Sequence, residues 1–413
     1  MKVVADLHMH SKYSRATSPG MELETLSKWA RIKGIDLLGT GDFTHPEWIK
    51  EIERKGIESD SGFLQYDGVN FVLSAEVSCI YSQGGKGRRI HIVLLSPSIE
   101  VAQQVNERLS KKGNLKSDGR PIFGMSAIEM CDIVLGVSEK NLVIPAHIWT
   151  PWFSAFGSMS GFDSLEDAFG ERKNDIYAVE TGLSSDPAMN WRLSALDRMQ
   201  LLSNSDSHSP EKIGREANVF NLDRLTYGEL YEAIRYKEKK KLLCTYEFYP
   251  EEGKYHFDGH RNCNVSLHPQ ETKKLNGVCP VCKKPLTIGV LSRVEALADR
   301  PEGFTPKNAV PFESLVPLKE ILADAFGKKP AAKAVEEQYA LLIKAFGSEF
   351  AVLHASHDKL KKAGGERLAE AILRVEQGRV KKVAGYDGEY GRIIIFDEKE
   401  KEREAGQKTL SEF

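Results

Sequence analysis

The sequence lacks three features that would assign it to a special class of protein. Its 57 basic and 59 acidic residues give a net charge of −2, so a polyanionic partner would need a local basic patch. We find no apolar run long enough to span a membrane, and no basic-then-apolar signal peptide at the N-terminus. Six cysteines in 413 residues do not indicate a disulfide scaffold. We therefore expect an intracellular, cytoplasmic protein with no membrane partner.

Seven short apolar runs recur through the first half of the chain. They are rich in β-branched residues or leucine and bounded by turn signals, as is typical of buried, mostly parallel strands. Helical patterns such as Glu22–Lys33 lie between several of them. This alternation predicts an α/β fold, either a β/α barrel or a doubly wound sheet. The seven runs are Val3–Leu7, Ile35–Gly39, Phe71–Ala75, Ile90–Leu95, Leu142–Pro145, Ile176–Val179 and Leu201–Ser203.

The character of the sequence changes near residue 236. The basic run "YKEKKKLL" precedes a small segment rich in cysteine and histidine, and the proline-rich stretch "ADRPEGFTPKNAVPF" has the composition of a linker. A mostly helical pattern follows, and the last dozen residues are polar. We expect a barrel over 1–235, a zinc-binding domain over 236–300, a helical region with a short β segment over 301–396, and a disordered tail over 397–413.

Histidine and carboxylate residues cluster at the ends of the predicted strands. One histidine on an apolar run is usually a packed core residue, but many buried charges at one end of a sheet are costly without bound cations. Imidazole and carboxylate ligands suit zinc, manganese or iron, and their number predicts two or three metals. The candidate metal ligands and catalytic residues are His8, His10, Asp42, His45, Glu76, His91, His147, Asp206 and His208, with Glu180 a weaker candidate.

A site with several metals typically hydrolyses phosphate esters, because the cations activate water and hold phosphoryl oxygens. Arginines near the candidate ligands could clamp phosphate, although each is as readily an ordinary surface residue. A lysine run could contact a nucleic-acid backbone, although such runs are usually only solvated. The basic candidates are Arg15, Arg88, Arg89, Lys239 and Lys240.

The loop after His147, "IWTPWFSAFGSMSGF", is crowded with aromatic residues. Rings of this kind could stack on a base drawn out of a duplex. Closure of the barrel mouth as part of the core is an equally good interpretation for any single ring. The rings are Trp149, Trp152, Phe153 and Phe156.

Two short pairs of potential zinc ligands, or knuckles, follow the barrel region. His260-x2-Cys263 and Cys279-x2-Cys282, fifteen residues apart, match a Cys3His zinc ribbon, with His268 as the alternative fourth ligand. Bound zinc would supply much of the folding free energy of so small a unit.

The strand-end motifs resemble, in order, those of the PHP (polymerase and histidinol phosphatase) superfamily over about residues 1–235. The segments are "DLHMHS", "GTGDFTH", "AEVS", "RIHIVLL", "PAHIW" and "SNSDSH". The resemblance implies a distorted seven-stranded β/α barrel with a trinuclear metal site. The implied ligands are His8, His10, Glu76, His91, His147, Asp206 and His208.

Two positions depart from the PHP pattern. Either Asp42 or His45 fits the ligand position after the second strand, and Asp42 is favoured because it lies nearer the strand end. The usual histidine after His10 is replaced by Ser14 and Arg15. We therefore expect Zn²⁺ in the ribbon and the active site, with one weaker active-site position that takes Mg²⁺ or Mn²⁺ instead.

Taken with "DGHRNCNV", "CPVCKKPLTIGVL", the helical region and "GYDGEYG", the motifs resemble the endonuclease Q family over nearly the whole chain. The resemblance implies a DNA-repair endonuclease that nicks 5′ of deaminated bases (hypoxanthine, uracil, xanthine) and abasic sites. The implied incision leaves a 3′-hydroxyl and a 5′-phosphate. The residues by themselves lead only to metal-dependent phosphoester hydrolysis. The alternatives are a phosphatase of small phosphomonoesters, a non-catalytic clamp-docking adaptor, and an exonuclease accessory to replication.

The C-terminal "QKTLSEF" resembles the motif by which DNA-repair proteins dock on the sliding clamp PCNA, through Gln407, Leu410 and Phe413. The pattern is short and lacks the second aromatic of the fullest form. The expected partners are therefore damaged double- or single-stranded DNA and PCNA, for a monomer associated with the nucleoid.

Overall fold

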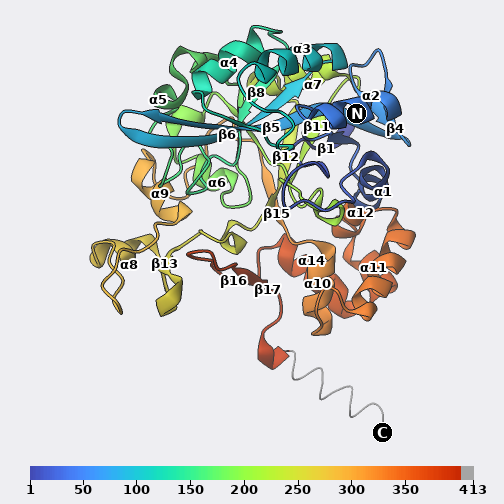
Figure 1. The fold of residues 1–413 in the computed structure, drawn as a ribbon. Helices are drawn as coiled ribbons and strands as arrows, with labels where there is room; N and C mark the ends of the chain where they lie inside the picture. The colour runs from blue at the N-terminus through green and yellow to red at the C-terminus, as the bar shows by residue number, and fades with distance from the viewer. Residues whose placement is uncertain (401–413) are drawn as a thin grey trace.

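Five of the seven predicted strands of the first half belong to one large mixed sheet, and the other two pair with each other. The structure is a computed structural model that describes residues 1–400 (Figure 1). All seven predicted runs contain a strand, which confirms the α/β class. The strands are β1 (Lys2–Asp6), β2 (Leu37–Gly39), β3 (Ile57–Glu58), β4 (Leu64–Tyr66), β5 (Val69–Gln83), β6 (Lys86–Ser96), β7 (Ile122–Phe123), β8 (Leu142–Pro145), β9 (Ala178–Glu180), β10 (Gln200–Leu202), β11 (Ala217–Asn221), β12 (Leu242–Phe248), β13 (Asp258–His260), β14 (Val265–Leu267), β15 (Phe312–Leu315), β16 (Lys381–Val383) and β17 (Arg392–Ile394).

The pairing of these strands is mixed in the first half. β1 pairs in parallel with β2, β2 with β5, and β9 with β10. β1–β11, β3–β4 and β4–β5 are antiparallel pairs. β6 also runs antiparallel, to both β5 and β8. The start of β6 therefore lies beside the ends of its neighbours, and a residue early in β6 can join residues that follow other strands.

Alternate residues of the strands pack into different hydrophobic clusters. Val3 and Ala5 of β1 belong to one cluster, and Val4 belongs to the other. The cluster that contains Val3 also receives residues from β2, β5, β6, β8, β9, β10, β11 and β12. Nine strands therefore share one core.

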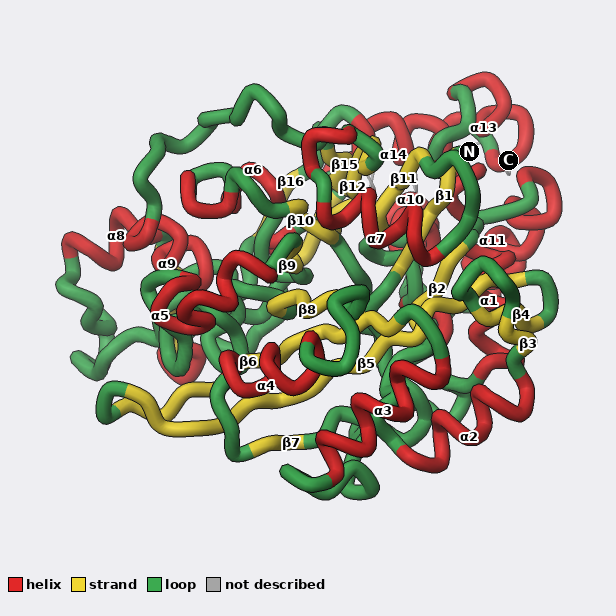
Figure 2. Tube along the Cα trace, turned by 90° about the horizontal axis from the view of Figure 1, so that it is seen from above, coloured by secondary structure: helices red, strands yellow, loops and turns green. Residues whose placement is uncertain are grey.

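Helices cover the outer faces of this sheet, and Figure 2 shows α3 and α4 alongside β5 and β6. Within residues 1–400, no helix has the length and apolar character that crossing a bilayer would require. The helices are α1 (Leu23–Lys33), α2 (Pro46–Lys55), α3 (Ile99–Ser110), α4 (Ala127–Leu135), α5 (Leu165–Phe169), α6 (Pro187–Asn190), α7 (Tyr227–Arg235), α8 (Pro269–Lys274), α9 (Val290–Leu297), α10 (Leu318–Phe326), α11 (Lys333–Phe346), α12 (Glu349–Leu353), α13 (His357–Gly364) and α14 (Glu366–Glu376).

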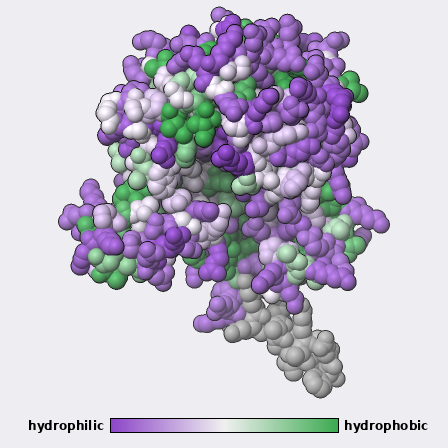
Figure 3. Space-filling view, viewed as in Figure 1, coloured by the Kyte–Doolittle hydropathy of each residue, from purple (hydrophilic) through white to green (hydrophobic). Residues whose placement is uncertain are grey.

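The second half of the chain extends the sheet and adds two smaller parts below it. β12 pairs with β11 and β15 pairs with β12, so the large sheet continues past residue 235. α10 to α14 form a helical part with its own core, and β13, β14 and α8 form the cysteine-rich part. The hairpin β16–β17 lies between these two parts in Figure 1. Figure 3 shows a largely hydrophilic face that is hollowed between the sheet and the parts below it.

Candidate active site

Glu76, in the long strand β5, lies at the centre of the candidate site and is fully buried. Its Oε1 lies 2.7 Å from His91 Nδ1 and 3.1 Å from His147 Nε2. Its Oε2 lies 3.2 Å from His10 Nε2 and 3.7 Å from His8 Nε2. Two groups of potential ligand atoms therefore meet at one carboxylate, and within each group the atoms lie within 4.8 Å of one another. The groups are His8, His10, Glu76 and Asp206, and Glu76, His91 and His147.

The antiparallel direction of β6 explains how His91 reaches this place. His91 pairs with Ser78, two residues beyond Glu76 in β5. The next residue, Ile92, pairs with Pro145 at the end of β8, two residues before His147. His91 is the sixth of the eleven residues of β6, and the antiparallel direction places it beside the second half of β5 and next to the end of β8.

Each of three histidines is oriented by a second polar group behind it. His8 donates its Nδ1–H to Glu180, at 2.9 Å from Oε1, and His10 Nδ1 lies 3.2 Å from Asp42 Oδ1. His147 Nδ1 lies 3.1 Å from the Thr150 hydroxyl. Partners of this kind fix the ring and leave the lone pair of Nε2 facing inward, as metal-binding histidines require.

Two further observations indicate that these residues can bind divalent cations. Three buried carboxylates, Asp42, Glu76 and Glu180, converge here with the partly exposed Asp206, and in the described chain only one arginine or lysine, Arg120, forms an ion pair with the two ligand groups. His8 Nε2 is buried without a hydrogen-bond partner. Cations would offset the surplus negative charge and give His8 Nε2 a partner.

The charges of these groups shift their pKa values accordingly. Burial raises the pKa of Glu76, but His91 and Arg120 outweigh it and hold that pKa well below its usual range. Burial likewise lowers the pKa of His8, but Glu180 and Glu76 raise it well above its ordinary value. Burial lowers the pKa of His91 to about 4, so this ring is a neutral imidazole near pH 7.

The backbone is strained at three of the candidate residues. Asp42, His147 and Asp206 have φ values of 47°, 29° and 45°, in the left-handed region that residues other than glycine rarely adopt. Strain of this kind concentrates at functional sites, where packing holds side chains in directions that the local chain disfavours.

The structure separates some predicted ligands from the two groups. Asp42 lies behind His10, and its Oδ2 accepts hydrogen bonds from Ser11 N and from the Ser11 and Ser14 hydroxyls. His45 stacks on Tyr13, with ring centroids 4.4 Å apart, and lies outside both groups. The ring of His208 lies 4.4 Å from that of His10, beside the first group but outside it.

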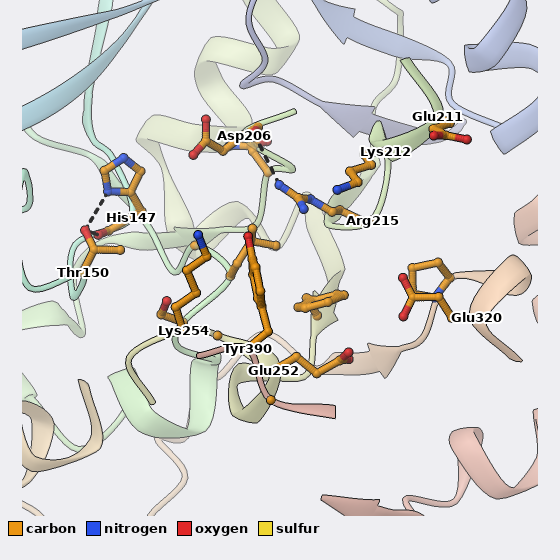
Figure 4. A pocket seen from close by; sticks show the side chains of 18 of the residues that line it. His147, Thr150, Asp206, Glu211, Lys212, Arg215, Glu252, Lys254, Glu320 and Tyr390 are labelled. Carbon is orange, nitrogen blue, oxygen red and sulfur yellow. Dashed lines mark hydrogen bonds between the residues drawn. The ribbon is translucent and has the colours of Figure 1, made fainter. Parts of the chain in front are cut away.

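A cavity of about 640 Å³ opens next to these residues. Figure 4 shows His147, Thr150 and Asp206 along one side, with Lys254 and Tyr390 rising toward them. The Tyr390 ring is 72% exposed, and Lys254 Nζ lies 4.5 Å from its centroid. The sequence interpretation missed this wall because Tyr390 is more than 240 residues away from His147 along the chain; the glycines that flank it were the one available signal.

Tight backbone contacts hold the Tyr390 loop in place. Gly385 N donates to Glu251 O, and Gly391 N donates to Glu252 O. A Cβ atom at Gly391 would overlap Glu251 O, so only glycine allows this close approach.

The aromatic loop after His147 is mostly internal. Trp149 and Phe156 are each 1% exposed and pack on one another, which is the core role that the sequence left open. Trp152 and Phe153 are partly exposed. Trp152 packs edge-on against Tyr255, which lines the cavity, and Phe153 lies against His91.

The predicted basic residues lie away from the two ligand groups. The side chain of Arg15 is 79% exposed and pairs with Asp118. Arg88 is tied to Gly161 O and lies over the Phe162 ring, and Arg89 lies 5.5 Å from the Phe153 ring. Lys239 pairs with Glu232, whereas Lys240 is exposed.

The predicted ribbon residues also come together. The ligand atoms of His260, Cys263, Cys279 and Cys282 lie within 4.8 Å of one another. His268, the alternative ligand, instead caps α8. The hydrophobic cluster around these cysteines holds three buried residues, so the unit has little core of its own. This donor set fits a tetrahedral zinc site.

The PCNA-like residues Gln407, Leu410 and Phe413 lie outside the described residues. That prediction still depends on the sequence.

Comparison with known proteins agrees with this geometry. Residues 317–379 match the family described as the MJ0043 C-terminal domain. The chain is 31% identical over 413 residues to the uncharacterized protein YqxK of Bacillus subtilis, covering 95% of this chain and 99% of that one. A crystal structure of PfuEndoQ from Pyrococcus furiosus, described as a lesion-specific endonuclease, has a TM-score of 0.86 and 32% identity, covering 96% of each chain.

A second solved structure shows Endonuclease Q with a 27-mer duplex substrate that carries an abasic lesion at the active site. Its TM-score is 0.86 at 33% identity, and the match covers 97% of this chain and 98% of that chain. The fold and the full-length match define a DNA-cleaving enzyme, and its histidine–carboxylate site fits divalent cations. The chain belongs to the endonuclease Q family, a family of DNA-cleaving enzymes.

Proposed function

We propose that this protein is a metal-dependent DNA-repair endonuclease that nicks the phosphodiester 5′ of deaminated bases and abasic sites. The observation that carries the proposal is the Glu76 carboxylate, shared by two histidine groups beside an open cavity. Full-length similarity to Endonuclease Q bound to a lesion duplex supports the choice of DNA. The nine strands that share one core support a PHP-type barrel as the scaffold.

The site's own residues prepare the reaction. Divalent cations bound there would activate water and stabilise the departing 3′-oxygen, leaving a 3′-hydroxyl and a 5′-phosphate. Glu180 and Asp42 hold His8 and His10 with their Nε2 lone pairs toward Glu76. Glu76 has a low pKa and stays ionised at neutral pH, so it can hold two cations at once. Zinc suits these ligands, with Mg²⁺ or Mn²⁺ at the weaker position.

The cavity is the place for the damaged nucleotide. Its volume of about 640 Å³ is ample for one nucleotide drawn out of the duplex, a rearrangement that costs a few kcal/mol of stacking. The exposed Tyr390 ring offers a stacking surface beside Lys254, in the role that the sequence assigned to the loop after His147. A platform that stacks on a base without reading its edge tolerates several lesions.

The remaining parts would hold flanking DNA and partners. The zinc ribbon and helical part lie below the large sheet (Figure 1) and would supply a surface for the duplex. Gln407, Leu410 and Phe413 are proposed to dock on PCNA, from their sequence alone. A monomer associated with the nucleoid suffices for this activity.

The test is incision of end-labelled duplexes that carry one deoxyinosine, deoxyuridine, deoxyxanthosine or abasic site, with wild type and His8→Ala side by side. We expect one nick 5′ of the lesion from the wild type, and loss of cleavage in the variant. The exposed Glu302→Gln variant, prepared in the same way, is the control and should nick like the wild type.

Other products would favour the alternatives. Hydrolysis of a free phosphomonoester without nicking would indicate a phosphatase, and shortening from an end would indicate an exonuclease. Metal binding without cleavage of any substrate would favour the non-catalytic clamp-docking adaptor.

A further inference from the structure

One cationic side chain touches the candidate metal site and is not accounted for by the ligand groups. Arg120 Nη1 lies 3.0 Å from Glu76 Oε2, the oxygen that also faces His8 and His10. Among the described arginines and lysines, it is the one that pairs with a member of either group. The Arg120 side chain is 30% exposed, whereas Glu76 is fully buried.

The loop that carries Arg120 is held firmly against the site. Asp118 Oδ1 accepts a hydrogen bond from Arg120 N at 3.1 Å, and Pro121 O accepts one from Ser78 N of β5 at 3.0 Å. Gly119 packs so closely that a Cβ atom there would overlap the Asp42 carboxylate. The backbone is fixed, and the long side chain is the part that can move.

Glu76 cannot retain every partner once cations bind. Both of its oxygens face histidine groups, so a cation at each group would contact this carboxylate. A guanidinium on the same oxygen would then lie beside a like charge, which is unfavourable in a buried site. The guanidinium offers planar, paired donors that match a phosphate.

We propose that Arg120 is a substrate-binding residue, which leaves Glu76 when cations bind and then holds the scissile phosphate. The inference rests on the proposed endonuclease activity. It differs from a purely structural role in one respect: Arg120 competes with the cations for Glu76, so its removal does not weaken metal binding.

The experiment compares wild type with Arg120→Gln, Arg120→Lys and Arg120→Ala, and with Arg224→Gln as the control. Arg224 is an exposed arginine in the turn before α7. Calorimetric titration of the metal-free proteins with Mn²⁺ measures cation binding. Single-turnover nicking of an abasic-site duplex measures the reaction, and added guanidinium tests chemical rescue of Arg120→Ala.

We expect Arg120→Gln to bind Mn²⁺ with the same stoichiometry and equal or higher affinity, and to nick about 100-fold more slowly. Arg120→Lys should keep part of the rate, and guanidinium should restore part of the rate of Arg120→Ala. A fall in Mn²⁺ stoichiometry or affinity in Arg120→Gln would make the residue a structural counter-ion and overturn the proposal. Nicking within threefold of wild type would overturn it too. If the wild type nicks no DNA, the proposed function fails instead, which the titration arm separates from failure of the Arg120 inference.

Discussion

Replacing Glu180 by glutamine tests how the structure prepares His8 for a cation. Three donors converge on this carboxylate. Oε1 lies 2.9 Å from His8 Nδ1 and 2.8 Å from Asn204 Nδ2, and Oε2 lies 3.0 Å from His8 Nδ1 and 3.1 Å from His147 N. Asn204 cannot turn over to help, because its Oδ1 already accepts from Leu7 N and Asn218 Nδ2.

Glutamine offers one acceptor where the carboxylate offers two. Whichever way its amide points, its NH₂ group faces either the Asn204 amide or the His147 N–H. One buried donor is left unpaired, at a cost of about 1–3 kcal/mol. Loss of the group behind a ligating histidine typically lowers metal affinity roughly 10- to 100-fold, or about 1.4–2.7 kcal/mol. We expect Glu180→Gln to fall in that range.

The assay is calorimetric titration of metal-free Glu180→Gln with Zn²⁺ and Mn²⁺, with nicking measured over the same metal range. The exposed Glu302→Gln removes the same charge elsewhere and should match wild type. If Glu180→Gln binds both metals as tightly as wild type, the orientation argument for His8 is wrong. If nicking is lost even at saturating metal, Glu180 has a further role.

Three other predictions follow from the structure. Cys279→Ser should remove one zinc ion per molecule and expose the 258–288 segment to proteases, because the ribbon has little core without its metal. Gly391→Ala should slow nicking roughly 10- to 100-fold, because its methyl group overlaps Glu251 O and displaces Tyr390. Burial raises the pKa of Glu247 to about 8. The folded protein thus keeps a proton that the unfolded chain releases above its pKa of about 4.5, so stability should fall from pH 5 to 8 by on the order of 1 kcal/mol per unit, and less in Glu247→Gln.

Matched variants decide these three cases. Cys244→Ser lies outside the ribbon group and should keep all the zinc, so equal zinc in both serine variants would contradict the ribbon assignment. Gly87→Ala has open space for its methyl group, and equal rates for both alanine variants would rule out the Tyr390 loop as a constraint. Parallel unfolding curves for wild type and Glu247→Gln at pH 5 and 8 would remove Glu247 as the source of the pH dependence.

Much of the candidate site was predictable because its residues carry local signals. His8 and His10 follow a β-branched run, and the structure places both Nε2 atoms within 4 Å of Glu76. The His260 to Cys282 spacing predicted a four-residue cluster, and the structure brings those residues together. Short strands, the polar residues that follow them and the two ligand pairs of the ribbon are each encoded by a few neighbouring residues, so the sequence alone reveals them.

Other parts depended on long-range packing. The sequence left Asp42 and His45 as alternatives for one ligand position and favoured Asp42. The structure places Asp42 behind His10, with its second oxygen hydrogen-bonded to Ser11 and Ser14. The local sequence around Arg120 carries no signal of a role, because its position beside Glu76 depends on how its loop packs against β5.

The sequence by itself determined which chemical groups the protein has, the strands that precede them, and the family that they resemble. Only the tertiary structure decided that Glu76 is shared by two groups, that β6 runs antiparallel so that His91 joins them, and that Tyr390 faces His147 across a cavity. The physical reason is the separation along the chain of the residues that interact. Strand patterns and knuckles follow from the periodicity of adjacent side chains, whereas the meeting of residues hundreds of positions apart is set by how the whole core packs.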